Sequence, residues 1–100
     1  MAREVVWSES AWAGLEEGAS YIARDSPYYA ASLVQKAKAI ARSLRLFPER
    51  GRHVPEYNNP AVRELSVGTY RLIYRISGDQ IVIVAFLHSA RDITDLSGPE

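Results

Sequence analysis

Cysteine is absent from this 100-residue chain, and neither sign of charge predominates. The lack of cysteine excludes a disulfide framework, a thiolate nucleophile and a cysteine-based zinc site, and it fits a reducing compartment. Twelve Lys and Arg residues balance twelve Asp and Glu residues. Proteins that bind nucleic acid mainly through its phosphates usually carry an excess of basic residues, so we expect no direct sequence-specific DNA binding.

The chain also lacks long hydrophobic runs and cofactor motifs. No apolar stretch reaches the roughly 20 residues that cross a bilayer, and the N-terminal sequence MAREVVWSES has no signal-peptide pattern. Glycine-rich nucleotide loops and the HExxH zinc motif are missing, and the two histidines, His53 and His88, are far apart in the sequence. We therefore expect a cytoplasmic protein that uses no membrane, metal or cofactor.

What the chain does contain is a globular composition, 47% hydrophobic and 24% charged, which suits one domain over residues 1–100. Disorder is expected in no more than the last few residues. The β-rich segment 3–7 predicts a first strand, and Ser8 can cap a helix expected over residues 9–24. Ser26 and Pro27 are typical of the start of a second helix. The apolar helix faces comprise Trp12, Leu15, Ala19 and Ile22, and then Ala30, Leu33, Val34, Ala37, Ile40, Ala41 and Leu44.

Three strands are expected in the second half of the chain. Pro48 ends the second helix, and residues 48–60 hold three prolines and predict a loop. Strands at 61–67, 69–76 and 81–87 follow, joined by turns at Gly68 and at 77–80. The order β-α-α-β-β-β predicts an α+β fold. In it, an antiparallel helical hairpin packs on one face of a mainly antiparallel four-stranded sheet.

The last expected strand, IVIVAFL, is apolar on both faces, although the helices can cover only one face of the sheet. An apolar row facing away from the helices is covered by the tail, the 48–60 loop or a second copy of the chain, or it marks a surface for a protein partner. By strict alternation, that row would be either Ile81, Ile83, Ala85 and Leu87, or Val82, Val84 and Phe86.

Several cationic residues could converge at one end of the sheet. Arg71 and Arg75 share a strand face with Ile73, and Arg63 could join them if the register of the neighbouring strand permits. The other candidates are His88, Ser89 and Arg91 after the last strand, and Arg50, Arg52 and His53 in the loop.

Such a set would suit cleavage of RNA, which needs a base, an acid and cations for the charge that develops on the phosphate. His88 or His53 could be the acid or base, and Arg71 or Arg75 the stabilising cation. The alternative is structural: the strand arginines pair with nearby carboxylates (Glu56, Glu64 or Asp79) and His88 makes a structural hydrogen bond. Ser89 beside His88 is no catalytic triad, because a nucleophile and its base meet in space and not by adjacency in sequence.

The segment 47–92 resembles the C-terminal half of RelE/ParE-family toxins from bacterial type II toxin–antitoxin modules. The resemblance rests on the loop PERGR at 48–52, REL at 63–65, YRLIYR at 70–75 and HSARD at 88–92. The first half, with Pro27 opening the second helix, follows the same layout.

The resemblance implies one of two activities. RelE-like members are strongly basic and cleave mRNA in the ribosomal A site, whereas ParE-like members share the fold, lack that catalytic set and poison DNA gyrase. This chain has only two lysines, no tyrosine after His88, and an ending that resembles the ParE-like members. Arg71, however, matches a strand arginine of the ribonuclease members.

The resemblance thus implies a ParE-like toxin without catalytic residues, which binds and inhibits DNA gyrase. A cognate antitoxin would neutralise it by lying along the sheet and the helical hairpin. The alternatives are an mRNA endonuclease that acts on the ribosome with Arg71, Arg75, His88 and Arg91, and a non-toxic relic that only binds antitoxin. The expected binding residues are Arg63, Arg71, Ile73, Arg75, Phe86, His88, Arg91 and Asp92.

Overall fold

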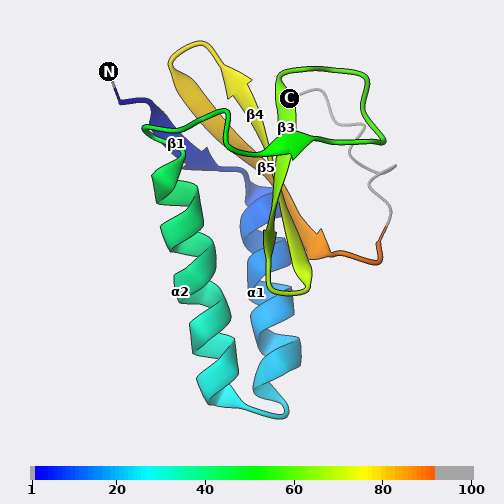
Figure 1. Cartoon of the computed structure of the whole chain (residues 1–100). Helices are drawn as coiled ribbons and strands as arrows, with labels where there is room; N and C mark the ends of the chain where they lie inside the picture. The colour runs from blue at the N-terminus through cyan, green and yellow to red at the C-terminus, as the bar shows by residue number, and fades with distance from the viewer. Residues whose placement is uncertain (1, 92–100) are drawn as a thin grey trace.

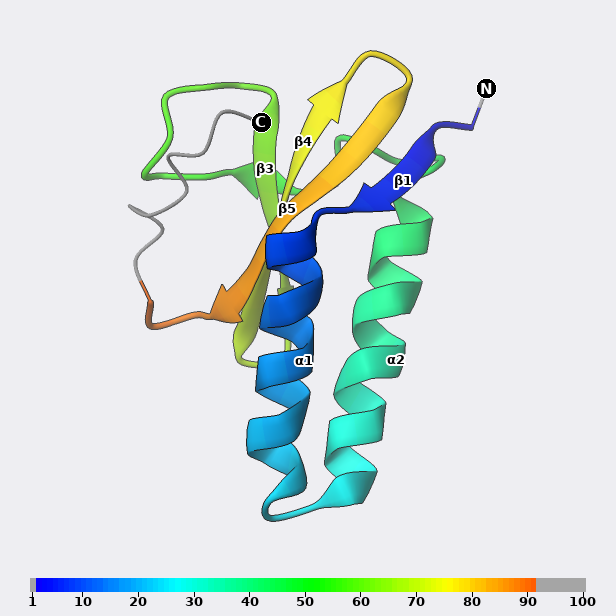
Figure 2. The same ribbon diagram turned by 180° about the vertical axis from the view of Figure 1, so that it is seen from behind.

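A helical hairpin covers one face of a sheet in the computed structural model, which describes residues 2–91 (Figures 1 and 2). The turn that joins the two helices projects beyond the sheet (Figure 1). The elements in chain order are β1 (Glu4–Trp7), α1 (Glu9–Ala23), α2 (Pro27–Ser43), β2 (Arg52–His53), β3 (Val62–Val67), β4 (Tyr70–Ser77) and β5 (Gln80–His88). The predicted α+β fold with a helical hairpin on one face of the sheet is confirmed.

Both helices begin at the serine caps that the sequence predicts. The hydroxyl oxygen of Ser8 accepts a hydrogen bond from the Ala11 amide at 3.0 Å, and that of Ser26 accepts one from the Tyr29 amide at 3.2 Å. Each cap satisfies one of the first-turn amides that have no partner within the helix. Pro27 occupies the first turn of α2, where its missing N–H group costs nothing.

The sheet has five strands in the order β1-β5-β4-β3-β2, so the predicted count of four is wrong. Arg52 and His53, which the sequence assigned to a loop, pair with Glu64 and Arg63 of β3 as the short strand β2. Two residues are too few to show a strand periodicity in the sequence. Strands β2 to β5 run antiparallel to their neighbours, and β1 pairs in parallel with β5.

A β-bulge in β5 changes which of its residues face the helices. Ile73 of β4 is opposite Ala85, and the next residue, Tyr74, is opposite Ile83, so Val84 is an extra residue. The bulge interrupts the alternation of side chains along the strand. Neither row predicted by strict alternation is therefore correct. Phe86, predicted as a binding residue, lies in the core beneath the helices and is only 3% exposed.

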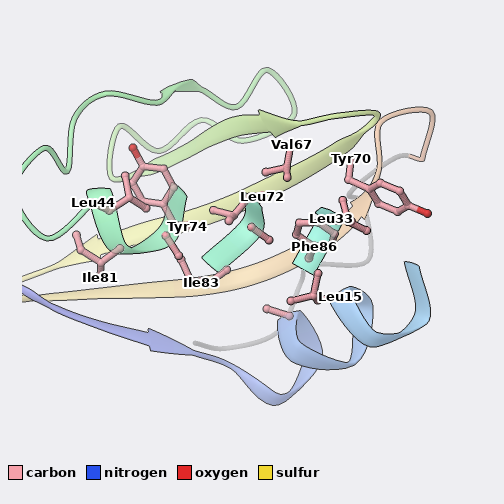
Figure 3. Packing of buried hydrophobic residues seen from close by; sticks show 13 residues of the cluster. Leu15, Leu33, Leu44, Val67, Tyr70, Leu72, Tyr74, Ile81, Ile83 and Phe86 are labelled. Atoms are coloured by element: carbon pink, nitrogen blue, oxygen red, sulfur yellow. The ribbon is translucent and has the colours of Figure 1, made fainter. Parts of the chain in front are cut away.

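The main core lies between the helical hairpin and the sheet (Figure 3). It includes Leu15, Leu33, Leu44, Val67, Tyr70, Leu72, Tyr74, Ile81, Ile83 and Phe86. On α1 the buried residues are Ala11, Leu15 and Gly18. Trp12, predicted on the buried face, is 38% exposed and packs edge-on against Trp7 of β1 with ring centroids 5.6 Å apart.

Buried Tyr74 anchors the PERGR loop, one of the segments on which the family resemblance rests. Its hydroxyl group donates to the Pro48 carbonyl at 2.7 Å and accepts from the Gly51 amide at 2.9 Å. A Cβ atom at Gly51 would lie 2.6 Å from this hydroxyl oxygen, so only glycine fits. The loop thus joins α2 to β2 through a fixed set of contacts.

Candidate functional site

The face of the sheet opposite the helices, here called the outer face, carries the predicted arginine pair. Arg71, Ile73 and Arg75 of β4 lie opposite Ser66, Glu64 and Val62 of β3, while Tyr70, Leu72 and Tyr74 belong to the core on the helix side. The prediction that Arg71, Ile73 and Arg75 share one strand face is confirmed.

The apolar centre of the outer face is covered by the chain itself. Ile73 packs with Val54, Val62 and Ala85 in a second buried cluster, against which Tyr57, Val84 and Leu87 also pack. Val54 and Tyr57 come from the 48–60 loop, which is one of the covers that the sequence left open. Ile73 is 0% exposed and therefore presents no surface to a partner.

Beside this cluster, four charged residues form an ion-pair network, here called the Arg71 cluster: Arg52, Glu56, Glu64 and Arg71. Arg71 Nε donates to Glu64 Oε1 at 2.7 Å, and its two Nη groups donate to Glu56 Oε1 and Oε2 at 3.0 and 3.2 Å. Arg52 Nε donates to Glu64 Oε2 at 2.8 Å. One Nη of Arg71 also lies 3.3 Å from the Arg91 carbonyl oxygen. The Arg71 side chain is only 12% exposed, and its donors are directed at protein oxygens.

The pairing shifts two pKa values in this cluster. The hydrogen bond from Arg71 lowers the pKa of Glu56 below its ordinary value of 4.5. The same hydrogen bond, together with that to Glu64, raises the pKa of Arg71, although burial opposes this shift. The ionised forms thus stabilise each other, as expected for charge-assisted hydrogen bonds.

The lowered pKa of Glu56 predicts a contribution to stability that acid removes. Because the folded state binds this proton less tightly than the unfolded state, the contribution is present above about pH 4.5 and is lost as the pH falls through the folded pKa. We expect Glu56→Gln to reduce the free energy of unfolding at pH 7 by about 1 kcal/mol and to have a smaller effect near pH 3. Urea unfolding at both pH values measures this difference.

The matched control for this prediction is Glu16→Gln, on the exposed surface of α1. Glu16 has no cationic partner among residues 2–91, and Glu and Gln have similar helix propensities. An equal pH dependence of the two variants would show that the Glu56–Arg71 pair contributes nothing to folding.

The predicted residues Arg63, His53 and His88 do not join Arg71. Arg63 is opposite Tyr74 on the helix side, where its guanidinium group donates to the Gly51 carbonyl at 2.8 Å, so the register excludes the predicted grouping. His53 pairs with Arg63 and shares that side. His88 is opposite Tyr70, also on the helix side, and packs edge-on against its ring at 5.3 Å.

His88, the last residue of β5, makes a structural hydrogen bond with the turn that follows the strand. Its Nδ1 accepts from the Ala90 amide at 3.2 Å. The Arg75 side chain lies on the outer face without a polar partner within residues 2–91, and Arg91 is exposed. Asp92 lies outside the described residues. Arg71 and the two histidines are thus on opposite faces of the sheet.

Within residues 2–91, no group of three or more histidine or carboxylate side chains is placed to hold a metal ion. Neither α1 nor α2 is long and apolar enough to cross a membrane. The surface has a polar hollow over the Arg71 cluster and Ser89, and a groove between β1 and α2 lined by both tryptophans. Another hollow, between α1 and the end of β5, is lined by three of the predicted residues, Phe86, His88 and Arg91. No sequence pattern predicted the groove between β1 and α2.

Comparison with known proteins identifies the family. The model described as the ParE toxin of the type II toxin–antitoxin system parDE matches residues 5–93. The chain belongs to this toxin family. It is also 35% identical over 89 residues to the toxin RelE2 of Caulobacter vibrioides, a match that covers 88% of this chain and 97% of that protein.

Two solved structures show the same fold at lower sequence identity. One is the chromosomal ParDE system from P. aeruginosa, with a TM-score of 0.71 and 22% identity, over 87% of this chain and 96% of that one. The other is the RelBE2 toxin–antitoxin complex from Mycobacterium tuberculosis, with a TM-score of 0.58 and 24% identity, over 88% and 99% of the two chains. The predicted membership of the RelE/ParE family is confirmed.

Proposed function

We propose that this chain is a cytoplasmic ParE-like toxin, held inactive by a cognate antitoxin, which inhibits DNA gyrase by binding when it is free. Membership of the ParE toxin family supports the toxin–antitoxin part of this proposal. The two structural relatives, described as ParDE and RelBE2 toxin–antitoxin systems, support an antitoxin as the partner.

The pairing of the Arg71 guanidinium group with two carboxylates is the observation that favours binding over RNA cleavage. An arginine that stabilises a phosphoryl transition state must direct its donors at the reacting phosphate. Here the guanidinium group of Arg71 is paired with Glu64 and Glu56, and the Arg71 cluster contains two cations and two anions. Its charges cancel, so it offers little attraction to an RNA phosphate.

The positions of the histidines also favour binding over RNA cleavage. General acid–base catalysis requires the acid or base to lie within hydrogen-bond reach of the group that it serves. His53 and His88 lie on the helix side of the sheet, whereas Arg71 lies on the outer face. A phosphate held at Arg71 would thus be separated from both histidines by the sheet.

Ribosome-dependent mRNA cleavage is the second candidate. It is supported by the relative that carries the name RelE2, and by the position of Arg71 on the outer face beside Ser66 and Ser89. It would require the Arg71 cluster to open when the ribosome binds, because both carboxylates would otherwise repel the RNA backbone.

Purified protein distinguishes the two functions. We expect the chain, mixed with gyrase, ATP and supercoiled plasmid, to increase the amount of linear DNA released by detergent and protease. We expect translating ribosomes to yield intact mRNA at the same toxin concentration. Prior mixing with the cognate antitoxin should abolish the gyrase effect.

Cleavage of mRNA that Arg71→Ala or His88→Ala abolishes would overturn this proposal, provided that circular dichroism shows both variants to be folded. A chain that binds the cognate antitoxin but affects neither gyrase nor growth would instead be the non-toxic relic.

A further inference from the structure

The hollow between α1 and the end of β5, here called the α1–β5 hollow, has a volume of about 390 Å³. Residues of α1, β4, β5 and the turn after β5 line it. It shares no residue with the hollow over the Arg71 cluster, which belongs to the outer face of the sheet. A concave and mostly apolar site of this size, with a few convergent polar groups, is the usual form of a small-molecule site.

Two glycines of α1 leave room for this hollow. Gly14 lies directly against the backbone of Phe86, and a Cβ atom at Gly18 would meet the ring of Tyr70 at 3.0 Å. The two glycines are four residues apart, so they lie on the same side of the helix. Glycine is a poor helix former, yet a side chain at either position would narrow the hollow.

Aromatic rings supply the apolar part of the lining. The rings of Tyr70 and Phe86 are stacked, with centroids 5.3 Å apart and planes inclined by only 10°. Tyr21 of α1 also lines the hollow, and it is 66% exposed. A planar ligand could therefore stack on one of these rings or pack edge-on against it, as aromatic pairs prefer.

The hollow also contains two neutral hydrogen-bond donors. Figure 3 shows the Tyr70 hydroxyl group directed away from the other labelled core side chains, and this group has no hydrogen bond within residues 2–91. Burial, together with nearby Tyr21 and Glu17, raises the pKa of Tyr70 above its ordinary value of 10.0, so the hydroxyl stays protonated at neutral pH. Because Nδ1 of His88 accepts from the Ala90 amide, a neutral His88 carries its proton on Nε2.

Two opposite charges line the hollow from different elements. Glu17 belongs to α1, and Arg91 belongs to the turn after β5. Neither charged group has a partner in the described part of the chain, so the two are not paired with each other. Backbone hydrogen bonds hold the turn, from the Arg91 amide to the His88 carbonyl at 2.9 Å and from the Ser89 amide to the Thr69 carbonyl at 2.8 Å. Separated charges of opposite sign suit a ligand that carries both signs.

We propose that the α1–β5 hollow binds a small zwitterion with an aromatic ring, the chemistry of a free aromatic amino acid. Its ring packs against Tyr70 and Phe86, and its ammonium group pairs with Glu17. Its carboxylate pairs with Arg91 and accepts a hydrogen bond from the Tyr70 hydroxyl group. An aromatic acid without an amine would instead meet the Glu17 carboxylate, and an aromatic amine without an acid would leave Arg91 unpaired. Binding at this hollow is independent of whether gyrase or the ribosome is the target of the toxin.

Four probes separate the contributions of the ring and of the two charges. L-phenylalanine has all three features, 3-phenylpropionate lacks the ammonium group, 2-phenylethylamine lacks the carboxylate, and L-leucine keeps both charges without a ring. Each is titrated into isotope-labelled protein, and amide chemical shifts are followed by NMR. We expect L-phenylalanine to bind with a dissociation constant of about 1 mM and to shift the amides of Gly14, Gly18 and His88. The other three probes should bind about fivefold more weakly or worse.

Neutral variants of the two charged residues should change which probe is preferred. Glu17→Gln should weaken binding of L-phenylalanine about fivefold without weakening that of 3-phenylpropionate. Arg91→Gln should have the same effect on L-phenylalanine without weakening binding of 2-phenylethylamine. A general loss of structure would weaken binding of every probe. Glu16→Gln is the matched control, because it makes the same change at the neighbouring exposed residue, which does not line the hollow.

Tyr70→Phe tests the hydroxyl donor and keeps the aromatic ring. Because the hydroxyl group has no hydrogen bond within residues 2–91, thermal unfolding of this variant should stay near that of the wild type. Binding of L-phenylalanine should weaken about threefold, whereas that of 2-phenylethylamine, which has no carboxylate, should not change.

Three outcomes would overturn the proposed site. Equal binding of L-phenylalanine and L-leucine would show that the aromatic rings do not select the ligand. Equal binding of L-phenylalanine by Glu16→Gln and Glu17→Gln would refute the ammonium contact. Amide shifts confined to other parts of the chain, or none at ten times the expected dissociation constant, would show that the hollow does not bind this class of ligand. None of these results would affect the proposed toxin function, which is measured with gyrase and with ribosomes.

Discussion

Replacing Glu64 with alanine is expected to lower the free energy of unfolding by about 3–5 kcal/mol, because it leaves a nearly buried guanidinium group with half of its counter-charge. Glu64 is 3% exposed and accepts from both Arg71 and Arg52. Arg71 is itself 12% exposed, so water replaces little of the lost interaction. Urea unfolding monitored by circular dichroism measures the loss.

Glu56→Ala is the control for this prediction, because it removes the other carboxylate from the same arginine. The Glu56 side chain is 30% exposed, and solvent screens its charge more effectively. We expect a loss of about 1 kcal/mol. If both variants lower the free energy of unfolding by the same amount, the burial of Glu64 does not explain its contribution to stability.

The Arg71 cluster also affects how mutations of this face are interpreted. Arg71→Ala would leave Glu64 buried with only the largely exposed Arg52 as a partner, and so it is expected to destabilise the fold. Loss of toxicity in that variant would thus have two explanations, a missing catalytic group or an unstable toxin. Stability and activity must be measured together on every variant of this face.

Sequence patterns predicted the features that depend on local chemistry. Serine and proline at the helix starts, and the regular alternation of β4, each reflect interactions among residues close together in sequence. The placement of Arg71 with Ile73 followed from that alternation. Arg63 was different, because its face depends on how β3 is aligned with β4.

The features that sequence patterns did not predict depend on tertiary pairing. The extra residue Val84 carries no sequence mark, because valine is equally common in regular strands, yet it reverses the direction of the side chains that follow it. The groove was missed because Trp7 and Arg42 belong to elements that pack together only in the folded chain. A helix without a single acidic residue was the signal that could have indicated it.

Replacing Gly14 with alanine, at the tight contact between α1 and β5, is the second change with a large expected effect on stability. Helix propensity favours alanine at this position, whereas packing against β5 disfavours it. Alanine has a higher helix propensity than glycine by about 1 kcal/mol, so Gly14→Ala would stabilise an isolated α1. In the folded chain, the added Cβ atom would overlap the carbonyl oxygen of Phe86 in β5 and lie 3.2 Å from its carbon atom. We expect a net loss of about 2–3 kcal/mol, and a decrease in Tm of roughly 10 °C or more.

Gly18→Ala, one helical turn further along α1, provides the comparison. Its Cβ atom would meet the ring of Tyr70 at 3.0 Å, and a side chain can move where the backbone of a central strand cannot. We therefore expect a smaller loss of stability for Gly18→Ala than for Gly14→Ala in parallel thermal unfolding measurements. If Gly14→Ala were more stable than the wild type, α1 could not rest against the Phe86 carbonyl, and the packing of the helical hairpin on β5 would be wrong.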